Sequence, residues 1–437
     1  MTKRYFLGAQ EVAGMMTRLN NAFHSMGIKS DFYCLYEYKF EEYNQDQAPR
    51  LLRIYRKHTN KIRKAKSIAA KKFWYFIQML DILRILVHSL IHYDNFIYIF
   101  GHGMFLYNYY LKNIEEFEFF VLKLFHKKMI MWNCGSDTRA PYCGVDLYNG
   151  DKERMYRDIV RKKNKVQMIE KYMICMDNPA SSHFHTKPYI STFAIGIPIE
   201  KKECVQKESS GERSENYVTI LHAPSNEKVK GTDIIRNIIN EIKEERNLKY
   251  VEVSGQTHME VLRKMKEADI IVDQLYTDTP MAGLATEASI NGIPVICAGY
   301  YAECYKKILK TPLHPTVYCL PEELKTKLLS LIDDRDKREK IGEAERNYVK
   351  ERLMSPDVAE RFIRVFEDDI SLDWICIPEE NEYIYGMGCP KEKVIENVVW
   401  LVEHYGEEAL GIPVHSKLMA RYRELYNQYT SEIGDGS

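Results

Sequence analysis

One stretch in the second half of the chain constrains the strand direction in the sheet that this half can form. An apolar run over 269–275 ends in a polar turn, Gly283 opens a short helical segment, Asn291-Gly292 closes it, and Pro294 leads into a second apolar run. Two strands joined through a helix run parallel, because the crossover returns the chain to the same end of the sheet. The stretch therefore predicts a parallel sheet covered by helices, with ligands bound where the strands end.

Short apolar runs alternate with helical periodicities along both halves of the chain. In the first half we expect strands at 5–9, 30–36, 96–100, 128–133, 172–176 and 189–193, and helices at 12–26 and 105–125. In the second half we expect strands at 217–222, 250–254, 269–275, 294–298 and 317–320, and helices at 232–246, 258–268, 322–334, 337–352 and 356–369. The alternation predicts an α/β fold of two doubly wound, Rossmann-like domains.

The expected domain boundaries follow from this pattern. We expect a first domain over 1–203, a polar and charged linker over 204–216, a second domain over 217–369 and a helical extension over 370–437. Within the extension, 391–405 carries an apolar stripe, which predicts a helix packed against its own protein.

The composition excludes several classes of protein. The 62 basic and 62 acidic residues balance, so no nucleic-acid partner is expected. The ten cysteines include no C-x-x-C pair and no zinc spacing, which predicts reduced cysteines in a cytoplasmic protein without a bound metal. The first residues lack an apolar run long enough for a signal peptide, and the uncharged run 96–111 is too short to span. The chain is therefore not expected to cross a membrane.

A basic segment begins at Arg50 and ends at Lys72. It holds ten Lys and Arg residues and no acid, interleaved with apolar residues. Two interpretations stay open: a solvated basic helix, or a patch that rests on anionic lipid headgroups, where each basic residue contributes roughly 1 kcal/mol. The second interpretation places the protein peripherally on the inner face of a membrane. RNA binding would need repeated aromatic interleaving, which this segment lacks.

The helical segment that starts at Gly283 and Leu284 has the features of an anion site. The first turn of a helix offers backbone N–H groups without partners and the positive end of the helix dipole, and both favour phosphate. Glu287 lies one turn further on, where its carboxylate can accept hydrogen bonds from sugar hydroxyls. The segment predicts a site for a phosphorylated sugar compound.

Two strand ends in the first half also carry polar residues beside glycines. One reads Gly101-His102-Gly103, and the other reads Cys134-Gly135-Ser136-Asp137-Thr138-Arg139. His102 is as compatible with a structural role as with a functional one, and Asp137 and Arg139 form either an ion pair or a substrate contact. The glycine spacings here and over 8–14 do not match the dinucleotide-binding fingerprint.

The second half contains four motifs in a fixed order. Ser-Asn-Glu-Lys-Val-Lys-Gly ends at Gly231, Val-Ser-Gly at Gly255, Ala-Asp-Ile-Ile-Val-Asp-Gln at Gln274, and Gly-Leu-Ala-Thr-Glu-Ala-Ser-Ile-Asn-Gly-Ile-Pro-Val-Ile at Ile296. This order resembles the donor domain of retaining glycosyltransferases of the GT-B fold and is similar to glycosyltransferase family 4. The resemblance covers about 217–369. It extends more loosely to the first domain, through the 8–14 loop and the Gly-Ser-Asp-x-Arg segment.

The resemblance implies two Rossmann-like domains facing across a cleft, with 356–369 or a later helix as a candidate to cross back to the first domain. It implies that Glu287 holds the ribose of a nucleotide-diphosphate sugar and that Lys230 with Gly231 contacts the diphosphate. Donor binding is further assigned to Asn226, Gly283 and Leu284, the acceptor side to Gly8, Gly14, Cys134, Gly135, Ser136 and Arg139, and catalysis to His102, Asp137 and Asp278. No divalent metal and no cofactor besides the donor substrate are implied.

This chain departs from the family pattern at two sites of chemistry. The carboxylate usual eight residues before the ribose-binding one is replaced by Thr279, which makes the adjacent Asp278 a substitute candidate. The usual histidine before Gly-Ser-Asp is replaced by Cys134, and His102 is the candidate to fill its place. The donor contacts also lack the family's basic residue before Lys230.

The sequence thus predicts a retaining glycosyltransferase of surface polysaccharide synthesis that uses a nucleotide sugar. The acceptor is expected to be a glycan or a lipid-linked glycan. Two other functions stay open: a catalytically inactive GT-B-like binding or scaffold protein, which the departures favour, and a nucleotide-sugar epimerase of the same fold.

Overall fold

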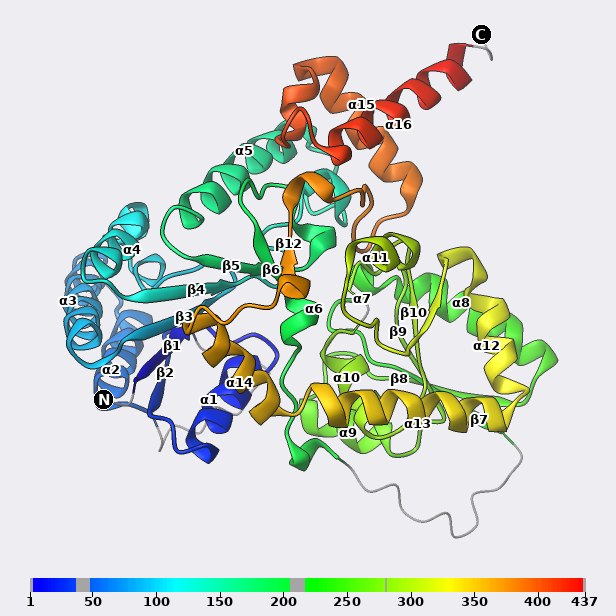
Figure 1. Cartoon of the computed structure of the whole chain (residues 1–437), viewed down its shortest axis with the longest axis horizontal. Helices are drawn as coiled ribbons and strands as arrows, with labels where there is room; N and C mark the ends of the chain where they lie inside the picture. The colour runs from blue at the N-terminus through cyan, green and yellow to red at the C-terminus, as the bar shows by residue number, and fades with distance from the viewer. Residues whose placement is uncertain (1–2, 37–47, 205–216, 280, 435–437) are drawn as a thin grey trace. The chain divides into compact units, whose positions relative to one another are not determined.

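A computed structural model describes residues 3–36, 48–204, 217–279 and 281–434 (Figure 1). The expected linker over 204–216 lies outside the described residues except for Cys204. The strands form a seven-stranded sheet in the order β12-β6-β5-β4-β3-β1-β2 and a five-stranded sheet in the order β11-β10-β9-β7-β8. β12 pairs antiparallel with β6, whereas β1–β5 and β7–β11 pair parallel. The predicted α/β fold with two parallel sheets is confirmed.

The chain forms two compact units, each described by itself. The first unit comprises Met1–Asp137, Lys165–Asp177 and Ser355–Ile370, and the second comprises Thr138–Asn164, Asn178–Met354 and Ser371–Ser437.

The first unit contains five parallel strands of the larger sheet and the helices around them. The strands are β1 (Tyr5–Ala9), β2 (Ser30–Cys34), β3 (Asn95–Ile99), β4 (Lys128–Trp132) and β5 (Ile174–Asp177), and the helices are α1 (Met15–Ser25), α2 (Arg50–Lys64), α3 (Ile68–His92), α4 (Glu115–Leu124) and α14 (Ser355–Phe366). Every residue of β1 and β3 is buried, as expected for central parallel strands covered on both faces. α14 packs on this unit, with the Phe362 ring 5.0 Å from that of Trp132.

The expected helix over 105–125 is wrong in its first half. Two 3₁₀ turns, η2 (Phe105–Tyr107) and η3 (Lys112–Ile114), precede α4. The carboxylate of Glu118 accepts hydrogen bonds from the N–H groups of Met104 and Phe105 at 3.0 and 2.9 Å, which fixes the chain ahead of these turns. Glu115 accepts one from Gly103 at 2.9 Å. The helix is interrupted at Asn108, which adopts an extended conformation and whose Oδ1 atom accepts a hydrogen bond from the N–H of Tyr110 at 2.8 Å. Local side-chain bonds of this kind compete with helix formation.

Glu118 also makes the stability of this unit depend on pH. Burial raises the pKa of Glu118 from its ordinary value to about 7. The folded chain then holds more protons than the unfolded chain between the ordinary value and about 7, so the free energy of unfolding falls as pH rises through that window. The slope is at most about 1.4 kcal/mol per pH unit for one group.

We expect Glu118→Gln to flatten this dependence, measured by urea denaturation at several pH values between 4.5 and 7.5. Glu116→Gln is the matched control, because Glu116 is exposed on the same helix. An unchanged slope in Glu118→Gln would assign the dependence to other groups.

The basic segment forms parts of two helices rather than one. α2 ends at Lys64, Ala65 adopts an extended conformation, and the hydroxyl of Ser67 caps α3 by accepting a hydrogen bond from the N–H of Ala70 at 3.1 Å. α3 then continues for 25 residues. It is long and apolar enough to cross a membrane, and only 33% of its most apolar window is buried.

The second unit is built around the five-stranded sheet. Its strands are β7 (Val218–His222), β8 (Leu248–Glu252), β9 (Ile270–Gln274), β10 (Val295–Ala298) and β11 (Val317–Cys319), with β6 (Tyr189–Ser191) and β12 (Ile375–Cys376) belonging to the other sheet. Its helices include α7 (Glu227–Lys230), α8 (Thr232–Glu245), α9 (His258–Met265), α10 (Gly283–Ile290), α11 (Ala302–Ile308), α12 (Leu324–Ile332), α13 (Arg335–Arg352), α15 (Lys391–Tyr405) and α16 (Lys417–Gly434), and α5 (Lys152–Ile169) begins in this unit.

Alternating side chains of these strands enter two separate cores. Ile270 and Val272 of β9 pack with α8 and α12, whereas Ile271 packs with α9, α10 and α13. This two-residue period places helices on both faces of the sheet, as Figure 1 shows. The stripe predicted for 391–405 lies on α15, where Val394, Val398 and Leu401 are fully buried.

Candidate functional site

The loops that follow β7, β8 and β9 open at one end of the five-stranded sheet. These three strands are neighbours and run parallel, so their carboxyl ends lie together. Lys230 follows β7, His258 follows β8, and Glu287 follows β9. Ligands bind at this end in open α/β sheets.

Lys230 is fixed by a buried partner on the neighbouring strand. Its Nζ atom lies 3.0 Å from Oδ1 of Asp273. The Asp273 side chain is fully buried, while 13% of the Lys230 side chain stays exposed. Asn226 starts the turn before it, since its Oδ1 atom accepts a hydrogen bond from the N–H of Val229 at 3.2 Å. The ammonium is thereby held at the end of β9 with part of its surface open to an anion.

Gly231 has a structural reason to be glycine. Its φ of 68° is left-handed, and a Cβ atom at this position would lie 2.9 Å from Cβ of Leu275. A side chain there is disfavoured by both the backbone conformation and the contact. The Lys230-Gly231 pair therefore sets how closely this loop approaches β9.

The N-terminus of α10 is open, in contrast to that of α1. Among the described residues, no side chain caps α10, and its first turn holds no acid, so the N–H groups of Gly283 and Leu284 have no intrahelical partner. At α1, the carboxylate of Glu11 accepts hydrogen bonds from the N–H groups of Val12, Met16 and Thr17 at 2.8, 3.0 and 2.9 Å. The positive end of α1 is thus occupied by the protein itself, and that of α10 is available to an external anion.

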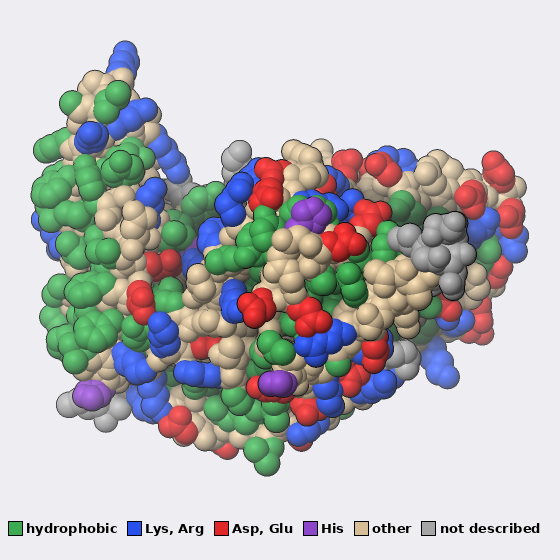
Figure 2. All heavy atoms as spheres, turned by 90° about the horizontal axis from the view of Figure 1, so that it is seen from above, with side chains coloured by type: hydrophobic (Ala, Val, Ile, Leu, Met, Phe, Trp, Pro, Cys, Tyr) green, Lys and Arg blue, Asp and Glu red, His purple; other side chains and the backbone are tan. Residues whose placement is uncertain are grey.

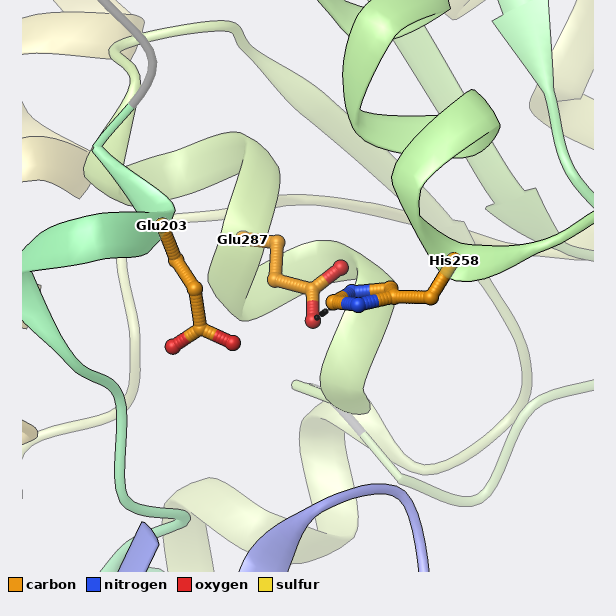
Figure 3. Close-up of side chains that lie close together, drawn as sticks. All are labelled: Glu203, His258 and Glu287. Atoms are coloured by element: carbon orange, nitrogen blue, oxygen red, sulfur yellow. Dashed lines mark hydrogen bonds and ion pairs between the residues drawn. The ribbon is translucent and has the colours of Figure 1, made fainter. Parts of the chain in front are cut away.

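Glu287 points toward a histidine that the sequence did not single out for chemistry. Nε2 of His258 lies 2.9 Å from Oε1 of Glu287, and Glu203 extends toward the same pair (Figure 3). The Glu287 side chain is 7% exposed and that of His258 is 40% exposed. The histidine orients one oxygen of the carboxylate at the surface of this sheet end.

These three residues form a group that could hold a metal ion. Their ligand atoms all lie within 4.8 Å of one another, and two carboxylates with an imidazole suit a divalent cation. Glu203 also has a purely structural contact, because its Oε2 atom accepts a hydrogen bond from the N–H of Glu200 at 2.8 Å and closes a 3₁₀ turn. That contact accounts for the placement of Glu203 without an ion.

Asp278 lies inside an ion pair. Nε of Arg139 donates to Oδ2 of Asp278 at 2.5 Å, and the two side chains are 6% and 0% exposed. Nδ2 of Asn178 donates to the Asp278 carbonyl oxygen at 2.9 Å and to Oγ1 of Thr279 at 3.0 Å. Arg139, predicted on the acceptor side, is therefore brought to the donor-side loop of the second unit.

The other predicted residues lie at strand ends of the first unit. Nζ of Lys165 lies 2.7 Å from Nδ1 of His102, a contact that orients the imidazole ring. Oδ1 of Asp137 accepts a hydrogen bond from the N–H of Cys134 at 3.0 Å. A Cβ atom on Gly101 would lie 3.6 Å from Cβ of Asp137, which places Asp137 beside the His102 loop.

Glycines and Ser136 complete this set. Gly8 is buried in β1, Gly14 begins α1 with φ 72°, and Gly135 has φ 101°. Ser136 is exposed beside them. Burial, with a contribution from Asp137, raises the pKa of the Cys134 thiol well above its ordinary value, so the thiol stays protonated at neutral pH.

The structure thus brings together Lys230, Gly283, Leu284 and Glu287 at one sheet end, and His102, Asp137 and Cys134 at another. Sequence reasoning missed Asp273, His258 and Glu11. Asp273 sits in the Asp-Gln ending of a predicted strand, a position where it could have been noticed. His258 and Glu11 reach their partners only through the fold.

No protein-family model and no curated protein matches the chain. Solved structures that are similar to it, all at low identity, include the following three. HepE of Anabaena, in complex with UDP-glucose, is 10% identical with a TM-score of 0.48, covering 84% of this chain and 99% of its own. A trehalose-6-phosphate synthase is 10% identical with a TM-score of 0.49 over 84% and 99%, and WaaG, a glycosyltransferase involved in lipopolysaccharide biosynthesis, is 12% identical with a TM-score of 0.46 over 83% and 99%.

Proposed function

We propose that the chain is a retaining glycosyltransferase that moves a sugar from a nucleotide-diphosphate sugar to a glycan or lipid-linked acceptor in the synthesis of surface polysaccharide. The observation that carries this proposal is the uncapped N-terminus of α10 on the same sheet end as Lys230 and Glu287. A helix N-terminus and a lysine provide two sources of positive charge for a diphosphate, and a carboxylate accepts hydrogen bonds from ribose hydroxyls.

In the transfer, the bond between the anomeric carbon and the diphosphate oxygen breaks, and a bond to the acceptor oxygen forms. The departing diphosphate gains negative charge, which the N–H groups of Gly283 and Leu284 and the ammonium of Lys230 stabilise. The proton of the acceptor hydroxyl passes to the departing diphosphate oxygen as the new bond forms. We assign acceptor contacts to the strand ends that carry His102 and Asp137, and we place the reaction in the cytoplasm.

One observation favours a binding protein without turnover as the second candidate. Asp278, the substitute for the family's missing carboxylate, is buried and neutralised by Arg139. A chain that binds nucleotide sugar without a free carboxylate at this loop would act as a scaffold.

A panel of nucleotide-diphosphate sugars tests the proposal. We expect one of them to raise the melting temperature, since a ligand at 100 times its Kd stabilises the folded state by about 2.7 kcal/mol. The same compound should be hydrolysed slowly and transferred to an acceptor glycan. Lys230→Gln should weaken binding of the diphosphate compounds and leave binding of the free nucleoside unchanged. Binding without turnover across donors and acceptors would establish the scaffold, and binding of no nucleotide sugar would reject both candidates.

A further inference from the structure

The first unit exposes an unusual concentration of large apolar side chains. Of the 24 large hydrophobic residues exposed among the described residues, twelve lie between residues 68 and 125. They are Ile68, Phe73, Phe76, Val87, Ile91, Tyr109, Tyr110, Ile114, Phe117, Phe120, Leu124 and Phe125. We call them the apolar face. Figure 2 shows hydrophobic side chains gathered over the part of the first unit that contains α3 and α4 in Figure 1. Exposed patches of this kind mark protein or membrane contacts.

The spacing on each helix aligns these residues along one side. Phe73 and Phe76 are three residues apart on α3, Val87 and Ile91 are four apart, and the two pairs are joined by whole turns. Phe117, Phe120 and Leu124 repeat the spacing on α4. The exposed fractions of Phe73, Phe117 and Leu124 are 56%, 52% and 62%. Each helix therefore has an outward apolar stripe, which is the pattern of a helix lying in an interface.

The opposite side of α3 ties the helix to its own unit. The buried Asp81 carboxylate lies 2.5 Å from Nδ1 of His58 and 3.0 Å from Nη1 of Arg84, and Nε2 of Gln78 donates to Oγ1 of Thr59 at 2.8 Å. A helix that spanned a bilayer would carry Asp81 into hydrocarbon, at a large cost. α3 can accordingly offer only its outer stripe to lipid.

The basic residues beside the apolar face indicate what kind of surface it contacts. Between Arg50 and Leu80 the chain holds ten Lys and Arg residues and no acid, and α2, which carries most of them, packs beside α3. Arg53, Lys57, Lys61 and Lys64 are exposed there. A symmetric dimer through α2 and α3 would bring like charges together, whereas anionic headgroups complement them.

We propose that the apolar face inserts into the headgroup region of an anionic membrane, with α2 bound to lipid phosphates. This membrane contact combines apolar insertion with charge and is independent of the proposed transferase activity. It differs from a purely electrostatic patch in one measurable way: high salt weakens it without abolishing it.

Vesicle flotation of the full chain tests the proposal. We expect binding to vesicles of phosphatidylglycerol and phosphatidylcholine, and weaker binding to phosphatidylcholine alone. The variant Phe73→Ser/Phe76→Ser/Phe117→Ser/Phe120→Ser should lose about tenfold or more in vesicle affinity at every salt concentration. Replacing Arg53, Lys57, Lys61 and Lys64 by Gln should reduce binding mainly at low salt. The matched controls are Ile234→Ser/Met259→Ser and Gln at Lys243, Lys249, Lys340 and Lys350, exposed residues of the second unit that should leave binding unchanged.

Hydrogen exchange of the unmodified chain gives a second measurement that requires no variant. Vesicles should protect α3 and α4 and leave α8 and α12 unchanged. Absence of vesicle binding, protection elsewhere, or a lipid-free dimer that the phenylalanine substitutions convert to monomer would overturn the proposal.

Discussion

Glu287→Gln is expected to lower kcat/KM for the donor by about 10- to 100-fold. The change removes the negative charge and leaves an amide oxygen of nearly the same shape. Hydrogen bonds to a charged acceptor contribute about 1.5–3 kcal/mol, compared with about 1 kcal/mol for neutral ones, so the donor's ribose loses much of its binding energy. His258 can still donate to the amide oxygen, and the fold should therefore be retained. Steady-state kinetics over a range of donor concentrations, together with the melting temperature, measure both effects.

His258→Gln measures how much the neighbouring histidine contributes to donor binding by Glu287. His258 is 40% exposed and orients one oxygen of Glu287 at 2.9 Å, so its replacement should have a smaller effect than the loss of the charge itself. Glu260→Gln, on the same helix but paired with Arg263 rather than with Glu287, should leave kinetics unchanged. If Glu287→Gln keeps the kcat/KM of the unmodified chain, the carboxylate does not bind the donor, and the assignment of the ribose to this sheet end fails.

The strands were predicted closely because burial on both faces leaves a strong apolar signal. β1 begins and ends at the expected residues, and β9 differs from its expected range by one residue at each end. The helix over 105–125 failed for a reason that is not local. Asn108 leaves the helical conformation, and its Nδ2 atom donates to the carbonyl oxygen of Tyr75 on α3, 33 residues earlier, a contact that exists only once α3 is in place.

The candidate site was likewise predicted only in part, because some of its contacts join residues far apart in sequence. Motifs and the chemistry of a helix N-terminus were enough to predict Lys230-Gly231, Gly283 and Glu287 as site residues. The parallel sheet brings them to one end. The partners that hold these side chains in place, Asp273 for Lys230 and His258 for Glu287, lie 43 and 29 residues away in sequence. No local pattern connects such pairs. The apolar face was missed because its residues are typical of a core helix, and only the structure shows which side of α3 is uncovered.

Breaking the ion pair between Arg139 and Asp278 is expected to lower the free energy of unfolding more than any other change proposed for this chain. Asp278→Ala leaves the guanidinium of Arg139 buried without its charged partner, and the loss of one member of a buried pair costs about 3–5 kcal/mol. Arg139→Met should cost a similar amount, because it leaves the carboxylate of Asp278 buried. The double variant Arg139→Met/Asp278→Leu should recover much of the loss, since apolar residues of similar volume often replace buried pairs at little cost. Urea denaturation of the three variants measures these differences.

An exposed pair of the same chemistry is the control. Arg246 and Asp333 are 41% and 48% exposed, so Asp333→Ala should cost less than about 1 kcal/mol. The comparison also distinguishes a positioning role of Asp278 from direct action of its carboxylate on the substrate. A positioning role predicts that turnover falls together with stability and returns in the double variant. If Asp278→Asn abolishes turnover while the free energy of unfolding stays unchanged, the carboxylate acts on the substrate itself, and the burial seen in this structure must open during the reaction.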